Sequence, residues 1–177
     1  MLRDVLGFTA HEVAEMLGTT PTSVNSALIR ARATVEERGA QPPDRAPASR
    51  SAQERELVTR FADAFERGDV EPIVALLTED AWLTMPPEPL EYQGHEAIKR
   101  FIAHAFAVRW DRPHRLVPTR ANTQPAFGHY VRDPHAEIGR ALGLFVLTLD
   151  GDHISQITRF AATGALPHFG LPRTIPW

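Results

Sequence analysis

The spacing of three small or aliphatic residues near the start of the chain constrains its fold more than any other feature. Ala14 is followed by Gly18 and then by Val24. This spacing predicts two short helices that cross closely, because alanine permits close approach, glycine can adopt the positive φ that ends a helix, and valine packs the second helix onto the first. The pattern is typical of a helix-turn-helix.

Capping signals predict where these two helices begin. Thr9 and Glu12 have the spacing of a capping box at the start of the first helix. An apolar stripe follows at helical spacing and consists of Ala10, Val13, Ala14 and Leu17. Proline is favoured in a first helical turn, so the second helix is expected to begin near Pro21 or Thr22.

The polar face of the second helix carries short hydrogen-bonding side chains first and guanidinium groups later. The candidate DNA-binding residues are Thr22, Ser23, Asn25, Ser26, Arg30 and Arg32. Small polar side chains at a helix N-terminus suit base edges in a groove, and arginines suit phosphates. A solvated helical hairpin would show the same residues, and residues 1–50 hold six basic and six acidic side chains. Bulk attraction to DNA is therefore expected to be weak.

Prolines separate this helical segment from the rest of the chain. Pro42, Pro43 and Pro47 disfavour regular structure and hold the chain partly extended. Four segments are predicted: a helix-turn-helix over 1–38, a linker over 39–51, a larger domain over 52–163 and a tail over 164–177. The tail ends in an apolar tryptophan and is expected to lie across the larger domain or a neighbouring surface. Its deletion is expected to leave the melting temperature of that domain nearly unchanged.

Periodicity predicts an α+β fold for the larger domain. Helices are expected over 52–67, 70–77 and 94–108, and strands over 81–85, 115–123, 124–131, 140–149 and 153–160. Asp150 and Gly151 predict a hairpin turn between the last two strands. The order of helix, helix, strand, helix and then several strands is typical of a curved antiparallel sheet covered by helices.

Length and composition set outer limits on the fold and the chemistry. A chain of 177 residues with 43% apolar side chains can bury one sizeable core and a small appendage. The absence of cysteine excludes disulfides, thiolate metal sites and a cysteine nucleophile. Residues 1–7 lack the features of a signal peptide, and no run of 18 apolar residues occurs. A cytoplasmic protein without membrane contact is expected.

The first segment resembles a known family of transcription factors. The run from Leu2 to Arg38, LRDVLGFTAHEVAEMLGTTPTSVNSALIRARATVEER, is similar to the end of region 4 of extracytoplasmic-function (ECF) sigma-70 factors. In that family this helix-turn-helix recognises the promoter −35 element. The resemblance implies promoter DNA and RNA polymerase core as partners. The pattern departs from the family in two ways: region 2 is missing, and the front helices of region 4 are shortened to residues 1–6.

The larger segment resembles the SnoaL-like domain that is fused after region 4 in one group of these factors. The similarity rests on RGDVEPIVALLTEDAWLTMPPEPLEYQGHEAIKRFI and DGDHISQITRF, and above all on Met85, Pro86 and Pro87 followed by Tyr92 and Gly94. It implies a cone-shaped α+β barrel, shared with nuclear-transport-factor-like and ketosteroid-isomerase-like proteins. Such cones enclose a pocket.

Six residues are candidates for the lining of that pocket: Trp82, Met85, Tyr92, Phe101, Phe145 and Phe160. His104, Asp80 and Tyr92 are weak candidates for catalytic groups, since no second acid or donor accompanies them at a fixed spacing. The histidines show neither an HxH nor an HxxxH pair, so neither a metal site nor a cofactor is expected.

Together these features favour a fragment of a DNA-binding transcription initiation factor. In this interpretation the SnoaL-like domain is an accessory or regulatory domain that acts through contact more than through catalysis. Two alternatives remain open. One is a stand-alone SnoaL-like isomerase, cyclase or hydrolase. The other is a module that binds a small molecule in the cone and forms a homodimer through the open face of its sheet.

Overall fold

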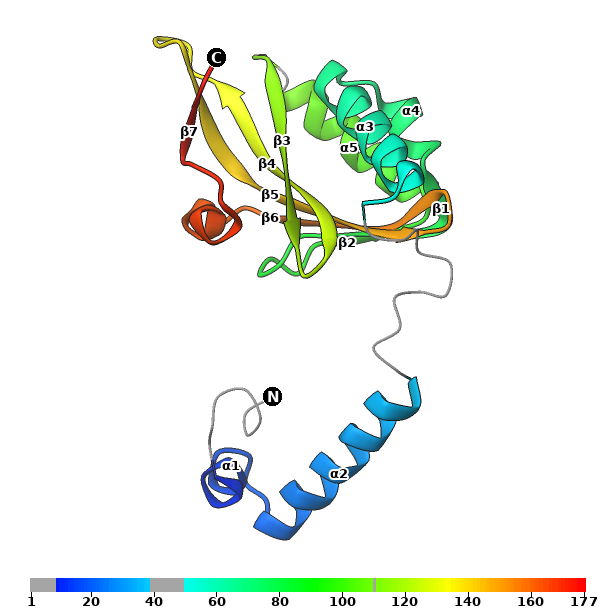
Figure 1. The fold of residues 1–177 in the computed structure, drawn as a ribbon, viewed down its shortest axis with the longest axis vertical. Coiled ribbons are helices and arrows are strands. Elements are labelled where there is room, and N and C mark those ends of the chain that lie inside the picture. The colour runs from blue at the N-terminus through cyan, green and yellow to red at the C-terminus, as the bar shows by residue number, and fades with distance from the viewer. Residues whose placement is uncertain (1–8, 39–49, 110) are drawn as a thin grey trace. The chain divides into compact units, whose positions relative to one another are not determined.

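A computed structural model describes residues 9–38, 50–109 and 111–177 of the chain. The chain divides into two compact units, Met1–Pro42 and Pro43–Trp177, each with its own elements (Figure 1). None of the helices in the described ranges is both long enough and apolar enough to cross a membrane.

The first unit contains helices α1 (Ala10–Met16) and α2 (Pro21–Arg38). The predicted capping box is confirmed: the Glu12 N–H donates to Thr9 Oγ1 at 3.3 Å, and the Thr9 N–H donates to the Glu12 carboxylate at 2.7 Å. Gly18 has a φ of +61°, which lets the chain turn between the helices. The second helix begins at the proline, as expected.

A small core joins these two helices. Val13, Ala14 and Val24 are buried together, as the spacing predicts, and Ala10 packs against them. Leu17 does not belong to this stripe, because 62% of its surface is exposed. The helix ends at Met16, and Leu17 adopts a cap conformation that leaves the helical periodicity.

Three helices of the second unit lie on one face of its sheet (Figure 1). Helix α3 (Ala52–Arg67) begins after the N-cap Ser51 and ends at Gly68, whose φ of +73° marks a left-handed cap. Helices α4 (Val70–Val74) and α5 (His95–Arg109) follow. Helix α4 is shorter than predicted because the chain already enters the sheet at Leu77.

Seven strands form one sheet in this unit. They are β1 (Leu77–Thr84), β2 (Glu91–Gln93), β3 (His114–Ala121), β4 (Gln124–Arg132), β5 (Ile138–Asp150), β6 (His153–Phe160) and β7 (Thr174–Pro176). The order is β2-β1-β6-β5-β4-β3, and β7 pairs with β5. All pairs are antiparallel except β1 with β6. The fold is α+β with a curved sheet and helices, as predicted. The two short strands, β2 and β7, were not predicted.

The main core lies between the helices and the sheet, and aromatic rings fill its centre. Phe61 of α3 stacks on Phe65 and on Phe127, with ring centroids 6.0 and 6.1 Å apart. Phe65 meets Phe145 edge-on at 5.0 Å. Ile98 of α5 is fully buried in the same cluster. These contacts fix α3 and α5 on the sheet, because burial of large aromatic and aliphatic side chains is the main source of stability.

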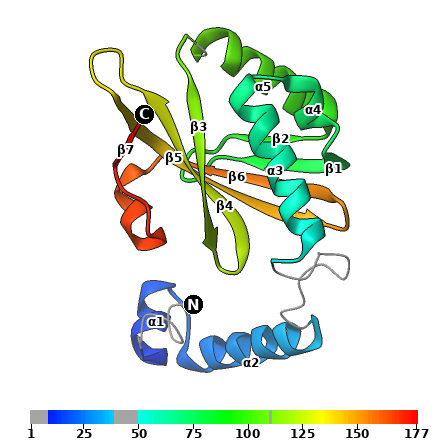
Figure 2. The same ribbon diagram turned by 45° about the horizontal axis from the view of Figure 1, so that its top comes forward.

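The C-terminal residues belong to the folded domain. A 3-10 helix, η1 (Thr163–Phe169), places Leu166 in a second core with Leu144 and Leu171. The Tyr130 hydroxyl donates to the Pro172 carbonyl at 2.6 Å. Figure 2 shows β7 beside β5. The expectation that deletion of 164–177 leaves the melting temperature unchanged is therefore corrected, since composition alone did not reveal this second core.

We expect Leu166→Ala to lower the free energy of unfolding by about 2–5 kcal/mol, because the side chain is fully buried and its removal leaves a cavity. Urea unfolding followed by circular dichroism measures this loss. Leu90→Ala is the matched control, since 43% of Leu90 is exposed. Equal effects of the two substitutions would contradict the packing of η1 described above.

Candidate functional site

One face of α2 presents short polar side chains to solvent. The exposed members of the predicted set are Thr22, Ser23, Asn25, Ser26 and Arg30. Arg32 lies further along α2, where side chains fall outside the described residues. Ser23 also takes part in the helix start, because its N–H donates to Thr20 Oγ1 at 3.2 Å and its hydroxyl lies 2.9 Å from the same atom.

The start of α2 favours a negatively charged partner. Its first turn contains no acidic residue. The helix dipole at such an N-terminus attracts anions, phosphates included. Exposed hydroxyl and amide groups follow within two turns. This arrangement can hydrogen-bond both phosphates and base edges.

The three weak catalytic candidates lie apart from one another. Asp80 of β1 and His104 of α5 are both exposed. Tyr92 of β2 is half-buried and stacks on Phe101, with ring centroids 4.5 Å apart. Within the described ranges, no hydrogen bond or ion pair joins any two of the three candidates. The described part of the structure therefore does not bring these three side chains together.

The six predicted pocket residues fall into separate places. Met85 and Phe145 are buried in the main core, and Tyr92 and Phe101 pack against its edge. Phe160 packs instead in the second core with Leu166. Trp82 is 39% exposed. The six side chains thus do not form one lining, because neighbouring positions on a strand point to opposite faces of the sheet.

A histidine pair that the sequence analysis missed lies inside the cone. His114 of β3 and His129 of β4 are 6% and 5% exposed. His114 Nδ1 and His129 Nε2 are 2.8 Å apart, so one ring donates a hydrogen bond to the other. The second ring nitrogen of His129, Nδ1, is buried and has no hydrogen-bond partner among the described residues.

The surroundings of this pair keep His129 neutral. Phe65 meets its ring edge-on at 5.2 Å, and Phe145 lies at 5.4 Å. Burial, reinforced by the nearby His114 and Arg159, lowers the pKa of His129 to about 3. Apolar surroundings disfavour the charged form of an imidazole. At neutral pH the ring can accept or donate a hydrogen bond but carries no charge.

Hairpin register explains both the pair and why it was missed. Strand β3 pairs Leu116 with His129, so His114 is the diagonal neighbour of His129 on the same face. The two histidines are distant in sequence, so a local motif such as HxH does not contain both. The pairing of the two strands about the turn at Asn122 and Thr123 is the signal that could have revealed the pair. The described residues contain no group of three or more His, Cys, Asp or Glu side chains that could hold a metal ion.

Comparison with protein families agrees with this architecture. The sequence pattern of the SnoaL-like domain matches residues 58–160. The chain belongs to the SnoaL-like domain family. This match runs from within α3 to the end of β6, and so includes both histidines of the buried pair but not the helix pair α1–α2.

Two curated relatives extend the similarity beyond this domain. The chain is 35% identical over 175 residues to the ECF RNA polymerase sigma factor SigG from two strains of Mycobacterium tuberculosis. The aligned region covers 99% of this chain and 47% of each relative. The chain therefore spans about half the length of the curated relatives that it matches.

Solved structures show the same fold at low sequence identity. An NTF2-like protein of unknown function from Mesorhizobium loti has a TM-score of 0.52 at 19% identity, covering 66% of this chain and 96% of that one. A SnoaL-like protein of unknown function from Burkholderia thailandensis has a TM-score of 0.50 at 16% identity, covering 66% and 99%. These likenesses concern the fold alone.

The lowered pKa of His129 predicts a loss of stability in acid. Between pH 6.5 and about 3 the unfolded chain binds a proton at this histidine and the folded chain does not. Burial of this histidine therefore does not lower the free energy of unfolding well above pH 6.5. Below that value the free energy of unfolding falls by up to about 1.4 kcal/mol for each pH unit, down to about pH 3. Urea unfolding at several pH values measures the slope.

Substitution separates this effect from the titration of carboxylates. His129→Gln should reduce the dependence of stability on pH between 6.5 and 4, because glutamine does not titrate. His104→Gln is the control, since His104 is exposed on α5. Identical slopes for the two variants would show that His129 is not the group responsible.

Proposed function

We propose that this chain is the promoter-recognition part of an ECF sigma factor, in which α1 and α2 form the helix-turn-helix of region 4. The observation that carries the proposal is the extent of the similarity to SigG. It runs over 175 residues at 35% identity, and so includes the helix pair as well as the SnoaL-like domain.

The geometry of the helix pair supports a DNA-binding role. The turn at Gly18 and the small core around Ala14 bury Val24 and leave the polar side chains of α2, Asn25 and Arg30 among them, exposed. No acidic residue lies in the first turn of α2 to repel phosphate. In the proposed role, Asn25 contacts a base of the −35 element and Arg30 contacts a phosphate.

Uncovered apolar side chains in the first unit support a protein partner. Met16, Leu17 and Ile29 are 56%, 62% and 68% exposed. They are three of the six large apolar side chains exposed among the described residues, and this concentration in the smaller unit is what a contact surface would show. We assign them to contact with RNA polymerase core, which a sigma factor must bind in the cytoplasm to act on promoter DNA.

The SnoaL-like domain fits an accessory role better than an enzymatic one. Aromatic rings stack on each other in the centre of the cone, and the buried histidine pair lies among them. An acid–base enzyme of this fold would need a carboxylate facing a donor in an apolar cavity. The carboxylate considered above, Asp80, is exposed on β1.

Selection of duplexes from a random pool by the purified chain tests the DNA-binding proposal. Asn25→Ala should lose about 1–3 kcal/mol of discrimination at one base pair of the selected sequence. Arg30→Ala should weaken binding to all duplexes and lower the slope of log affinity against log salt by about one. Fluorescence anisotropy at several salt concentrations measures both effects.

Gln53→Ala and Arg60→Ala are matched controls, because both side chains are exposed on α3 in the other unit. Neither control should alter binding. If no sequence is enriched, or if the controls weaken binding as much as Arg30→Ala does, α2 is not the recognition helix. The dimeric small-molecule module would then be the better interpretation.

A further inference from the structure

A groove beside the start of α3 lies apart from the histidine pair and from α2. Its lining includes Arg50, Arg55 and Val58 at the beginning of the helix, Pro118 and Arg120 of β3, and Phe169 of η1. The cavity volume is about 680 Å³. This volume falls in the range of about 300–1,000 Å³ that is usual for small-molecule sites. We call it the α3 groove.

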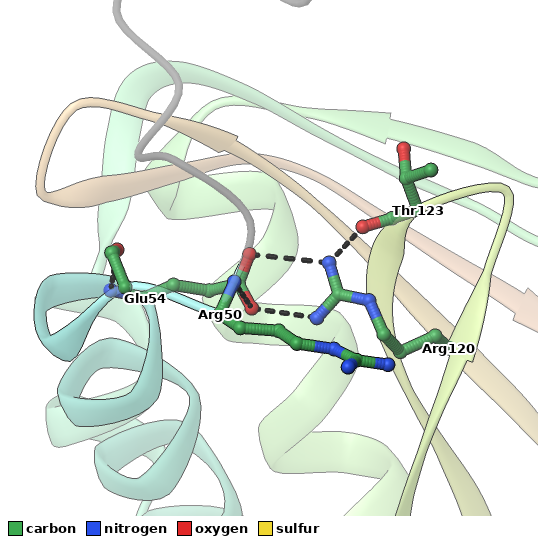
Figure 3. Close-up of polar contacts among 5 residues, drawn as sticks. Arg50, Glu54, Arg120 and Thr123 are labelled. Carbon is green, nitrogen blue, oxygen red and sulfur yellow. Dashed lines mark hydrogen bonds and ion pairs between the residues drawn. The ribbon is translucent and has the colours of Figure 1, made fainter.

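An ion pair with a buried glutamate fixes one wall of the α3 groove. Glu54 is 5% exposed, and its carboxylate accepts hydrogen bonds from Arg120 Nη1 at 2.6 Å and Nη2 at 3.3 Å (Figure 3). The Arg50 N–H donates to the same carboxylate at 3.1 Å. Arg120 also donates to the Thr123 carbonyl. A bidentate pair of this kind holds both side chains in one orientation.

The lining of the groove carries an excess of positive charge. Three arginines and one glutamate line it, and the glutamate is already paired with Arg120. Within residues 9–38, 50–109 and 111–177, neither Arg50 nor Arg55 forms an ion pair. Two exposed guanidinium groups at one edge of a cleft raise the local concentration of anions.

The floor of the groove is apolar. Val58 packs against the main core and Phe169 against the second core, so both are held in place. Pro118 and Pro125 complete this surface from two neighbouring strands. Guanidinium groups beside an apolar floor complement a molecule that has a negatively charged group and a hydrocarbon or aromatic body.

The edge of β3 argues against an extended peptide as the occupant. Within the part of the chain that the structure describes, this strand pairs with β4 alone, so its other side could in principle accept another strand. However, the Leu116 N–H already donates to Glu66 Oε1 at 2.7 Å, and Pro118 has no N–H. Neither position can donate a backbone hydrogen bond to an added strand. A molecule in the groove must therefore bind through the side chains that line it.

We propose that the α3 groove binds a small organic acid with an apolar body, its carboxylate, sulfonate or phosphate group held by Arg50 and Arg55. The apolar body lies over Val58, Pro118 and Phe169. Such a site would make the SnoaL-like domain a receptor for an amphipathic anion at a position outside the interior of the cone. The inference does not depend on DNA binding by α2.

Fluorescence titration of the full chain with 8-anilinonaphthalene-1-sulfonate tests the proposal. N-phenyl-1-naphthylamine has the same ring system without the sulfonate and serves as the neutral probe. The wild-type chain should bind the sulfonate more tightly than the neutral probe. The double substitution Arg50→Gln/Arg55→Gln should weaken sulfonate binding by about tenfold, the equivalent of one charge-assisted hydrogen bond, and leave the neutral probe unaffected.

Arg60→Gln/Arg100→Gln is the matched control, because it removes the same charge from exposed positions on α3 and α5 outside the groove. It should leave sulfonate binding unchanged. Thermal melts should show both double variants folded, since none of these four side chains is buried. Amide chemical shifts at Ala126 and Phe169, which both line the groove, should move on addition of the sulfonate.

Three results would overturn the proposal. The first is equal loss of affinity in the two double variants, which would indicate a general effect of net charge. The second is equal binding of the two probes, or no binding of either. The third is a set of shifts confined to α1 and α2, where Met16, Leu17 and Ile29 offer a different apolar surface.

Discussion

The packing of α3 on the sheet is the contact on which the larger unit depends. Phe61 and Phe65, one helical turn apart, bring their rings against Phe127 and Phe145 of two neighbouring strands. This packing surrounds His129 with apolar rings. Its burial against Phe65 and Phe145 keeps the imidazole neutral.

Polar groups of the same helix organise the neighbouring strand β3. Glu54, near the start of α3, fixes Arg120, and Glu66, near its end, accepts the Leu116 N–H. The same helix thus contributes side chains to the core, to one wall of the α3 groove and to the edge strand β3. Because these roles share one rigid element, a change in the packing of α3 would alter the groove as well as the core.

The two units differ in how far they can stabilise themselves. The helix pair buries only Val13, Ala14 and Val24 among its described residues and leaves Met16 and Ile29 uncovered. The larger unit has two buried clusters, and its C-terminal residues complete the second. A small unit with few buried side chains gains stability from further contacts, whereas the SnoaL-like unit has a core large enough to fold by itself.

The sequence by itself determined the features that local chemistry controls. The capping box at Thr9, the glycine turns, the bounds of α3 and most strands follow from residues close together in the chain. Only the tertiary structure decided which distant side chains meet. The register of β3 and β4 brings His114 within hydrogen-bond distance of His129. The tertiary fold pairs Glu54 with Arg120 and packs Leu166 in the second core. These contacts depend on strand pairing and burial between segments far apart, which local periodicity does not encode.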